Sequence, residues 1–362
     1  MNFDFYFCIR AFGISALALS SGLLMAQNTP APFFPLPQPT VSTVPPNGDV
    51  NPYGVAFVPK NFAPGGVLNP GDVLVSNFNN AQNLQGTGTT IVRITPNGQS
   101  SVFFQGNRGL GLTAALGIVR GGFVFAGNTP TADGTSATVT AGSVLVLNSK
   151  GQLVGTLTDP KLVDGPWGMA VRDLGTSAQI FFSNVLNGTI TRLDVQVFGG
   201  AWIQVRDAIT IASGYAHRTD PAALVLGPSG LVYNPANDTL YVASSAENAV
   251  FAIAQPGDLS ADGGRGQMIY QDNTHLHGPI DLVIAPSGHL IVANSDGSNA
   301  DPNQPSELVE FTPNGQFVSQ YSVDPNNGGA FGVGVMNLGD ALRFAAVDDN
   351  ANALKIWTVV TQ

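Results

Sequence analysis

A short phrase recurs six times along the chain, at intervals of roughly 50 to 60 residues. It reads Pro, any residue, Gly or Asp, and then three or four apolar residues. Four copies are clear and two are degenerate; in chain order they are NPYGVAF (51–57), AALGIV (114–119), GPWGMAV (165–171), GPSGLVY (227–233), GPIDLVI (278–284) and GAFGVGV (329–335). Self-similarity at this period is typical of propellers and solenoids, in which each repeat buries its apolar face against its neighbours.

Each copy is followed by three further strand-like segments. In the first repeat these are GDVLVSN (71–77), TTIVRITPNGQ (89–99) and SSVFFQ (100–105). The Asn97-Gly98 pair, like Asn314-Gly315, supplies the positive φ angles that a tight hairpin requires. Four antiparallel strands per repeat, without helical periodicity, predict an all-β protein: a six-bladed β-propeller forming a single domain over residues 51–362.

The last repeat stops after its third strand, at Gln362. Ahead of the first repeat, the Pro-rich segment 27–50 contains PTVSTVP (39–45), which has the composition of a strand. We expect residues 39–45 to complete the last blade, because closing the ring in this way removes an exposed sheet edge. The alternative is that the whole of 27–50 is a linker.

Residues 1–26 have the layout of a signal peptide. An apolar run, Ala11 to Met25, follows Arg10 and precedes Ala26, so we expect cleavage near Ala26 and a secreted, periplasmic or extracellular mature protein. The alternative is an uncleaved anchor. The only cysteine, Cys8, lies inside this segment, so the mature chain would carry no disulfide and no thiolate metal site.

The charge of the chain bears on whether its partner could be a nucleic acid or a membrane. The net charge is −10, and the 14 Lys and Arg residues are scattered singly. Without a basic stripe we expect no nucleic-acid partner and no membrane insertion of the mature chain. The partner is therefore an unknown ligand or protein, and the oligomeric state is left open.

Long loops are predicted mainly on one face of the propeller. In an antiparallel meander, the connections between strands two and three and between successive blades share a face. That face receives most of the long insertions, at 78–88, 129–141, 208–226 and 295–305. Long loops on a rigid ring usually carry function, so we expect the functional site on this loop-rich face.

The repeated phrase, the following strand and the Asn-Gly hairpin together resemble those of the NHL-repeat propellers, and gluconolactonase-type lactonases and streptogramin lyase are similar in the same way. This resemblance implies the fold, which serves binding scaffolds and enzymes alike. The cation-binding Glu that the lactonases carry near the first blade is absent from NPYG, and Asp281 occupies the Gly position of its phrase. The resemblance to the lyase, which has a histidine in its channel, implies His277 as the corresponding residue. His277 and Asp281 are thus weak catalytic candidates, and we expect neither metal nor cofactor.

Aligning the repeats predicts two rings of side chains at the channel mouth. The first is an apolar collar of Tyr53, Trp167 and Phe331 with Leu116, Ile280 and Ser229; the second is an amide ring of Asn77, Asn128, Asn184 and Asn294 with Asp348. Together they could form a ligand pocket with an apolar floor and a polar rim. The alternative is that the collar plugs the channel and the Asn residues serve left-handed turns.

These observations favour an exported, non-catalytic propeller that binds a ligand or a protein partner on its loop-rich face. The alternative is a lyase- or lactonase-type enzyme acting at the same channel mouth. It is disfavoured because the sequence offers no acid–base partner for its candidate residues.

Overall fold

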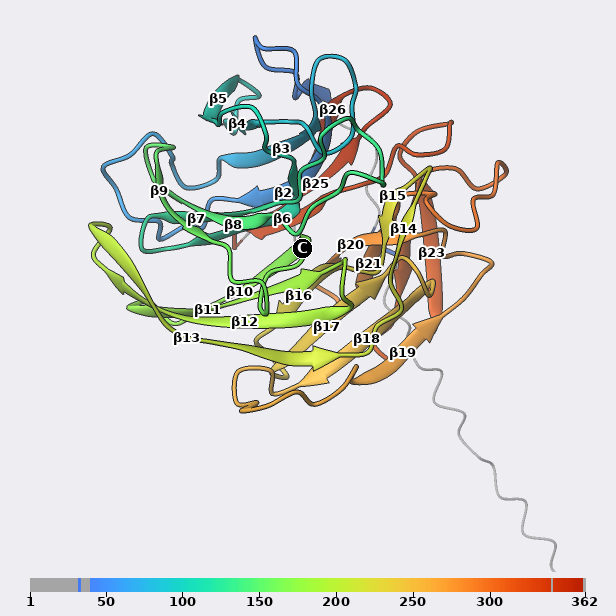
Figure 1. Cartoon of the computed structure of the whole chain (residues 1–362). Helices are drawn as coiled ribbons and strands as arrows, with labels where there is room; N and C mark the ends of the chain where they lie inside the picture. The colour runs from blue at the N-terminus through green and yellow to red at the C-terminus, as the bar shows by residue number, and fades with distance from the viewer. Residues whose placement is uncertain (1–31, 34–39, 340, 361–362) are drawn as a thin grey trace, which may run out of the picture. The chain divides into compact units, whose positions relative to one another are not determined.

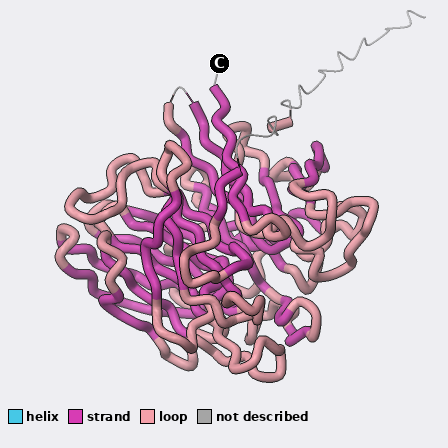
Figure 2. Tube along the Cα trace, turned by 90° about the horizontal axis from the view of Figure 1, so that it is seen from above, coloured by secondary structure: helices cyan, strands magenta, loops and turns pink. Residues whose placement is uncertain are grey.

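The computed structural model describes residues 32–33, 40–339 and 341–360, so the predicted signal peptide lies outside the described residues. All regular secondary structure in this part of the chain is strand (Figure 2). No helix that could span a bilayer occurs in it. Apolar strand segments broken by Gly, Asn and Pro turns account for this uniform architecture.

Twenty-four strands form six antiparallel, four-stranded sheets, the blades of a six-bladed β-propeller (Figure 1). Blades 1 to 3 consist of β2 (Val50–Phe57), β3 (Val73–Asn79), β4 (Thr90–Ile94) and β5 (Ser100–Gln105); β6 (Leu112–Val119), β7 (Phe123–Asn128), β8 (Ser143–Asn148) and β9 (Leu153–Leu157); and β10 (Pro166–Asp173), β11 (Ser177–Asn184), β12 (Thr189–Phe198) and β13 (Trp202–Ser213). Blades 4 to 6 consist of β16 (Pro228–Asn234), β17 (Thr239–Ser244), β18 (Ala249–Ala254) and β19 (Gln267–Gln271); β20 (Pro279–Ile284), β21 (Leu290–Asn294), β22 (Glu307–Phe311) and β23 (Phe317–Ser322); and β24 (Val333–Asn337), β25 (Ala341–Asp348), β26 (Ala353–Val360) and β1 (Thr40–Ser42). The predicted fold is confirmed.

The N-terminal strand closes the ring, as predicted. β1 pairs antiparallel with β26, with Val41 opposite Leu354, and becomes the outer strand of blade 6. The backbone N–H and the hydroxyl of Thr43 then both donate to the Asn352 carbonyl, at 3.0 and 2.9 Å. The sequence predicted a strand over residues 39–45, but only Thr40–Ser42 pair with β26.

The six repeated phrases form the innermost strands, and each contacts the next around the ring. A buried serine links blades 1 and 2: Ser76 Oγ accepts the Gly54 N–H at 2.9 Å and donates to the Thr113 carbonyl at 2.7 Å. Ser183 does the same between blades 3 and 4. The backbones approach so closely here that a Cβ on Gly54 would lie 2.7 Å from the Ala114 carbonyl oxygen. This close approach explains why the phrase needs glycine.

Two details differ from the sequence-based expectation. The connection 208–226 is not one loop: β13 runs to Ser213, and β14 (Arg218–Asp220) and β15 (Leu224–Leu226) form an extra hairpin. In blade 2 the predicted alignment is wrong by two residues. Strand pairing places Leu116 level with Val55, not with Tyr53, and Leu112 level with Pro52. Gly117 is therefore not the counterpart of Gly54, and β6 carries one additional residue between Leu112 and Leu116.

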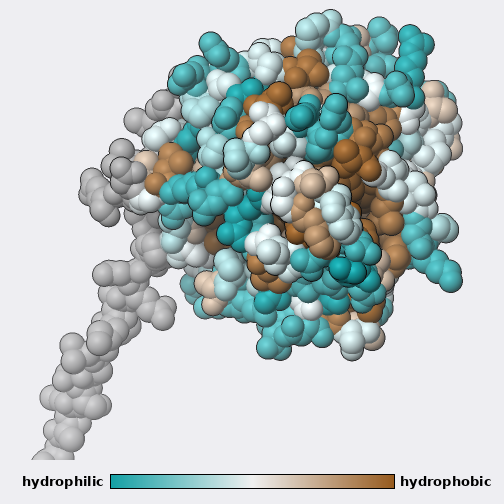
Figure 3. Space-filling view, turned by 90° about the vertical axis from the view of Figure 1, so that its left-hand side faces the viewer, coloured by the Kyte–Doolittle hydropathy of each residue, from teal (hydrophilic) through white to brown (hydrophobic). Residues whose placement is uncertain are grey.

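The outer surface is mixed in character. Hydrophobic residues on the side shown in Figure 3 are interspersed among hydrophilic ones and gather in short patches. Exposed apolar side chains on outer strands include Leu153, Val154 and Trp202, each about half exposed. Single exposed apolar residues are normal on a protein surface, so these side chains do not by themselves mark a binding site.

Candidate functional site

An aromatic cluster fills the middle of the channel. Tyr53 stacks on Phe331 with ring centroids 4.5 Å apart and meets Trp167 edge to face at 5.8 Å. Phe78 packs against both Tyr53 and Trp167, at 4.7 and 5.3 Å. These four side chains are buried, Trp167 being only 2% exposed. The structure therefore brings together the three predicted collar aromatics, and we call them, with Phe78, the aromatic plug.

A cavity of about 340 Å³ lies on the loop-rich side of the plug. Tyr53, Phe331 and Ile280 line it as apolar groups, and the extra β14–β15 hairpin contributes Val225 and Leu226. Its polar lining comes from strand ends and loops of several blades and consists of Asn51, Asn79, Asn83, Gln85, Ser245, Ser295, Asp296 and Asp349. No Lys, Arg or His is among the described residues that line it. We call this space the loop-face cavity.

Three buried oxygen atoms in this lining have no hydrogen-bond partner: Asn51 Oδ1, Asn79 Oδ1 and Asp296 Oδ1. Other atoms of these three residues do make hydrogen bonds: Asn79 Nδ2 donates to Asn83 Oδ1 at 2.7 Å, the Asn51 N–H donates to Asn352 Oδ1, and Asp296 Oδ2 accepts the Ser306 N–H. Buried acceptors without a partner are costly. The three acceptors therefore belong to residues that line one cavity, and each is covered in this structure.

Asp349 adds a carboxyl group to the same wall. Burial, reinforced by the neighbouring charge of Asp348, raises the pKa of Asp349 to about 7. Burial and the nearby Asp349 also raise the pKa of Tyr53 well above its usual range. The Tyr53 hydroxyl is therefore neutral, and Asp349 changes its protonation state near neutral pH.

The predicted amide ring holds the blades together. Asn128, Asn184 and Asn294 are buried at the ends of their second strands, and Asn77 is buried two residues before the end of β3. Each side chain bonds to the backbone of the segment that leads into its own blade: Asn77 to the Thr43 carbonyl, Asn128 to the Gly111 N–H, Asn184 to the Leu162 carbonyl and the Asp164 N–H, and Asn294 to the His275 carbonyl. Asp348 accepts a bond from the Ala351 N–H and pairs with Lys355.

None of these four Asn residues has a positive φ. The left-handed turn geometry proposed for them is therefore wrong, because the side-chain bonds supply the reason for Asn at these positions. Their amide groups are largely used inside the fold, and none of them lines the loop-face cavity.

His277 lies beside this cavity, within a buried polar cluster of blade 5. It is 2% exposed; its Nδ1 donates to the Asn299 carbonyl at 2.6 Å, and its Nε2 has no partner. Asp296 and Glu307 both interact electrostatically with it. Burial, followed by the charge of Asp296, raises the pKa of Glu307 to about 7.

This carboxylate neighbour of His277 was missed from the sequence. Glu307 opens a third strand, and only the folded hairpin brings it to Asn294, whose Nδ2 donates to Glu307 Oε2 at 3.4 Å. Asp296 lies in the intervening loop at a φ of 57°. No spacing rule would have joined these residues.

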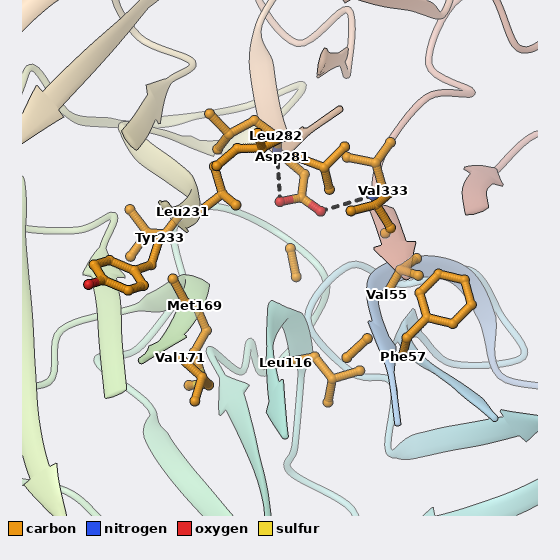
Figure 4. Close-up of a pocket in the computed structure, with 18 of the residues that line it drawn as sticks. Val55, Phe57, Leu116, Met169, Val171, Leu231, Tyr233, Asp281, Leu282 and Val333 are labelled. Atoms are coloured by element: carbon orange, nitrogen blue, oxygen red, sulfur yellow. Dashed lines mark hydrogen bonds between the residues drawn. The ribbon is translucent and has the colours of Figure 1, made fainter. Parts of the chain in front are cut away.

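Asp281 lies on the other side of the plug. It lines a second cavity of about 360 Å³, shown in Figure 4, to which most of the other lining residues bring apolar side chains. Burial raises the pKa of Asp281 to about 7. His277 and Asp281, paired as candidates in the sequence, therefore do not share a site.

A resident divalent cation is not supported by the side chains present. Hard cations take six to eight oxygen ligands, with several carboxylates among them. The described residues contain no group of three or more His, Cys, Asp and Glu placed to hold a metal ion. We therefore derive no step through a metal.

No protein-family model and no curated protein sequence matches this chain. Among solved structures, a luciferin-regenerating enzyme is similar with a TM-score of 0.52 and 10% identity, over 89% of this chain and 95% of the other. The calcium-binding protein regucalcin from Agrobacterium tumefaciens is similar with a TM-score of 0.51 and 13% identity, over 90% and 96%. At this identity the likeness shows the fold alone: a six-bladed propeller of the kind that the repeat predicted.

Proposed function

We propose that this propeller is an exported binding protein that holds a small, hydroxyl-rich molecule in the loop-face cavity. The observation that carries the proposal is that three residues lining one cavity each hold a buried acceptor without a partner: Asn51 Oδ1, Asn79 Oδ1 and Asp296 Oδ1. Hydroxyl groups donate hydrogen bonds to such acceptors.

The floor supports the same ligand class. Tyr53 and Phe331 offer aromatic carbon to the cavity, and the non-polar face of a small ring can pack on it. A volume of about 340 Å³ falls at the small end of ligand pockets. A lining without Lys, Arg or His among the described residues disfavours phosphorylated and carboxylated molecules.

Calorimetric titration of the mature chain with neutral sugars tests the proposal. The probes are D-glucose, D-galactose, D-mannose and D-sorbitol. We expect saturable binding of at least one, weakened about tenfold by Asp349→Asn, since a hydrogen bond to a charged group contributes about 1.5–3 kcal/mol.

Asp207→Asn is the matched control, because Asp207 is exposed on β13 and should leave binding unchanged. Absence of saturable binding for all four probes would refute the proposal. Equal affinities for the wild type and Asp349→Asn would count against this site.

The second candidate, a lactonase-type enzyme in the same cavity, is favoured by one observation. A carboxyl with a pKa of about 7, that of Asp349, is suited to general acid–base catalysis at neutral pH. It predicts hydrolysis of D-glucono-1,5-lactone faster than in buffer, lost in Asp349→Asn and kept in Asp207→Asn. A wild-type rate equal to that of buffer supports the binding protein instead.

Export is the remaining part of the proposal. It is supported by the apolar run from Ala11 to Met25. Intact-mass analysis of the protein recovered outside the cytoplasm should give a chain that starts near Gln27. A full-length chain beginning at Met1 would contradict it.

A further inference from the structure

The cavity beyond the aromatic plug is separate from the proposed binding site and has a different chemistry. Residues before the anchor position, such as Tyr53 and Ile280, line the loop-face cavity, whereas residues after it line this one. The apolar lining includes Val55, Leu116, Met169, Leu231, Leu282 and Val333 (Figure 4). We call this space the lower cavity.

One carboxylate lies among these apolar side chains. Asp281 stands where the phrase has glycine in the other clear copies, and its side chain lies between blades 5 and 6. Its Oδ1 accepts the Leu282 N–H and its Oδ2 accepts the Val333 N–H, both at 2.9 Å (Figure 4). These two bonds fix the carboxylate and leave each oxygen able to accept one more.

No cation in the described protein neutralises this charge. The lining contains no Lys, Arg or His, and its other titratable side chain, Tyr233, donates its hydroxyl to Asp238 at 2.8 Å. The pKa of Asp281, raised to about 7 by burial, reflects the missing counter-charge. A blade-to-blade link needs no carboxylate, because Ser76 and Ser183 make such links with a hydroxyl.

We propose that the lower cavity is a second binding site, which takes a small hydrophobic ammonium ion with its charged end on Asp281 and its hydrocarbon part against the apolar walls. A volume of about 360 Å³ accommodates a short alkyl chain or one aromatic ring. An ammonium group donates up to three hydrogen bonds and neutralises the buried charge.

The test compares n-hexylammonium with two matched probes by isothermal titration calorimetry on the mature chain. 1-Hexanol has the same hydrocarbon chain without the charge, and methylammonium has the charge without the chain. We expect hexylammonium to bind at least tenfold more tightly than either. Asp281→Gly, which restores the residue found at the equivalent place in other blades, should bind hexylammonium and hexanol within threefold of each other.

A second variant keeps the carboxylate and fills the space. Val335 lines the cavity and is half-buried, so Val335→Trp should fold and lose both hexylammonium and hexanol binding; it decides the question if Asp281→Gly does not fold. Asp349→Asn, in the other cavity, should change nothing here. Equal affinity of the wild type for hexylammonium and hexanol, or hexylammonium binding that survives Val335→Trp, would overturn the proposal while leaving the sugar site untouched.

Discussion

Tyr53 and Trp167 meet edge to face across the channel, with ring centroids 5.8 Å apart and ring planes at 85°. They come from blades 1 and 3, which are not neighbours in the ring. Their contact therefore braces the ring across its axis and, with Phe78 and Phe331, separates two cavities that are lined by different residues.

Removing the Trp167 side chain from this contact should lower the free energy of unfolding. Trp167 is 2% exposed and packs on Tyr53 and Phe78, so Trp167→Ala leaves a buried cavity beside these two rings. We expect a loss of about 3–5 kcal/mol in the free energy of unfolding, measured by denaturant melts. Trp202→Ala is the control: Trp202 is 50% exposed, and its removal should cost about 1 kcal/mol or less. A Trp167→Ala protein as stable as the wild type would mean that the indole does not plug the channel.

Ring closure predicts an effect of the N-terminal strand. A chain beginning at Asn47 lacks β1 but keeps Asp49, whose Oδ2 accepts the Thr89 N–H at 2.8 Å. Without β1, the edge of β26 is exposed, so the melting temperature should fall and aggregation should rise relative to a chain beginning at Thr40. Scanning calorimetry and light scattering measure both, and equal melting temperatures would contradict closure by β1.

Stability should fall as the pH rises from about 4 to 8. Burial raises the pKa values of Asp281, Asp349 and Glu307 to about 7, so between the unfolded and folded pKa values the folded state holds more protons than the unfolded state. The free energy of unfolding then decreases with pH across this window. The pKa of Asp272 is lowered to about 2, so its effect on the free energy of unfolding falls below this pH window.

Melting temperatures at pH 5, 6, 7 and 8 measure this slope. Asp349→Asn removes one of the three groups and should flatten it, whereas Asp207→Asn should keep the wild-type slope. A melting temperature that rises from pH 5 to pH 8 would contradict these assignments.

Divalent cations should stabilise the protein little. Binding to the folded state alone would raise the melting temperature with cation concentration, but no group of three metal-binding side chains exists in the part of the chain that the structure describes. We expect a shift of about 1 °C or less in 5 mM calcium. A shift of several degrees, reversed by a chelator, would instead support a resident cation.

The repeat made the fold predictable, because each phrase carries both the apolar pattern of an inner strand and the glycine that close blade contact requires. Tyr53, Trp167 and Phe331 could be placed together for the same reason: they precede that glycine in their blades. Leu116 was misplaced by two residues, because Gly117 is not the counterpart of the anchor glycine and because an extra residue in β6 changes the register without changing the composition.

The polar part of the site was less predictable. Asn51 in β2, Asn79 at the end of β3 and Asp349 just after β25 meet at one cavity only through tertiary contacts. The bonds of the amide ring to the backbone of preceding segments leave no mark in the sequence, so the sequence could not decide between a polar rim and a role within the fold. The sequence shows that Asp281 replaces a glycine of the repeat. Only the structure shows that Asp281 lies in the lower cavity and not in the loop-face cavity.

The most direct test of the account is a crystal structure of the mature chain grown with the tightest-binding sugar. We expect the sugar ring to lie against Tyr53 and Phe331, with hydroxyl groups within hydrogen-bond distance of Asn51 Oδ1, Asn79 Oδ1 or Asp349. Sugar bound outside the loop-face cavity, with only water above the aromatic plug, would contradict it.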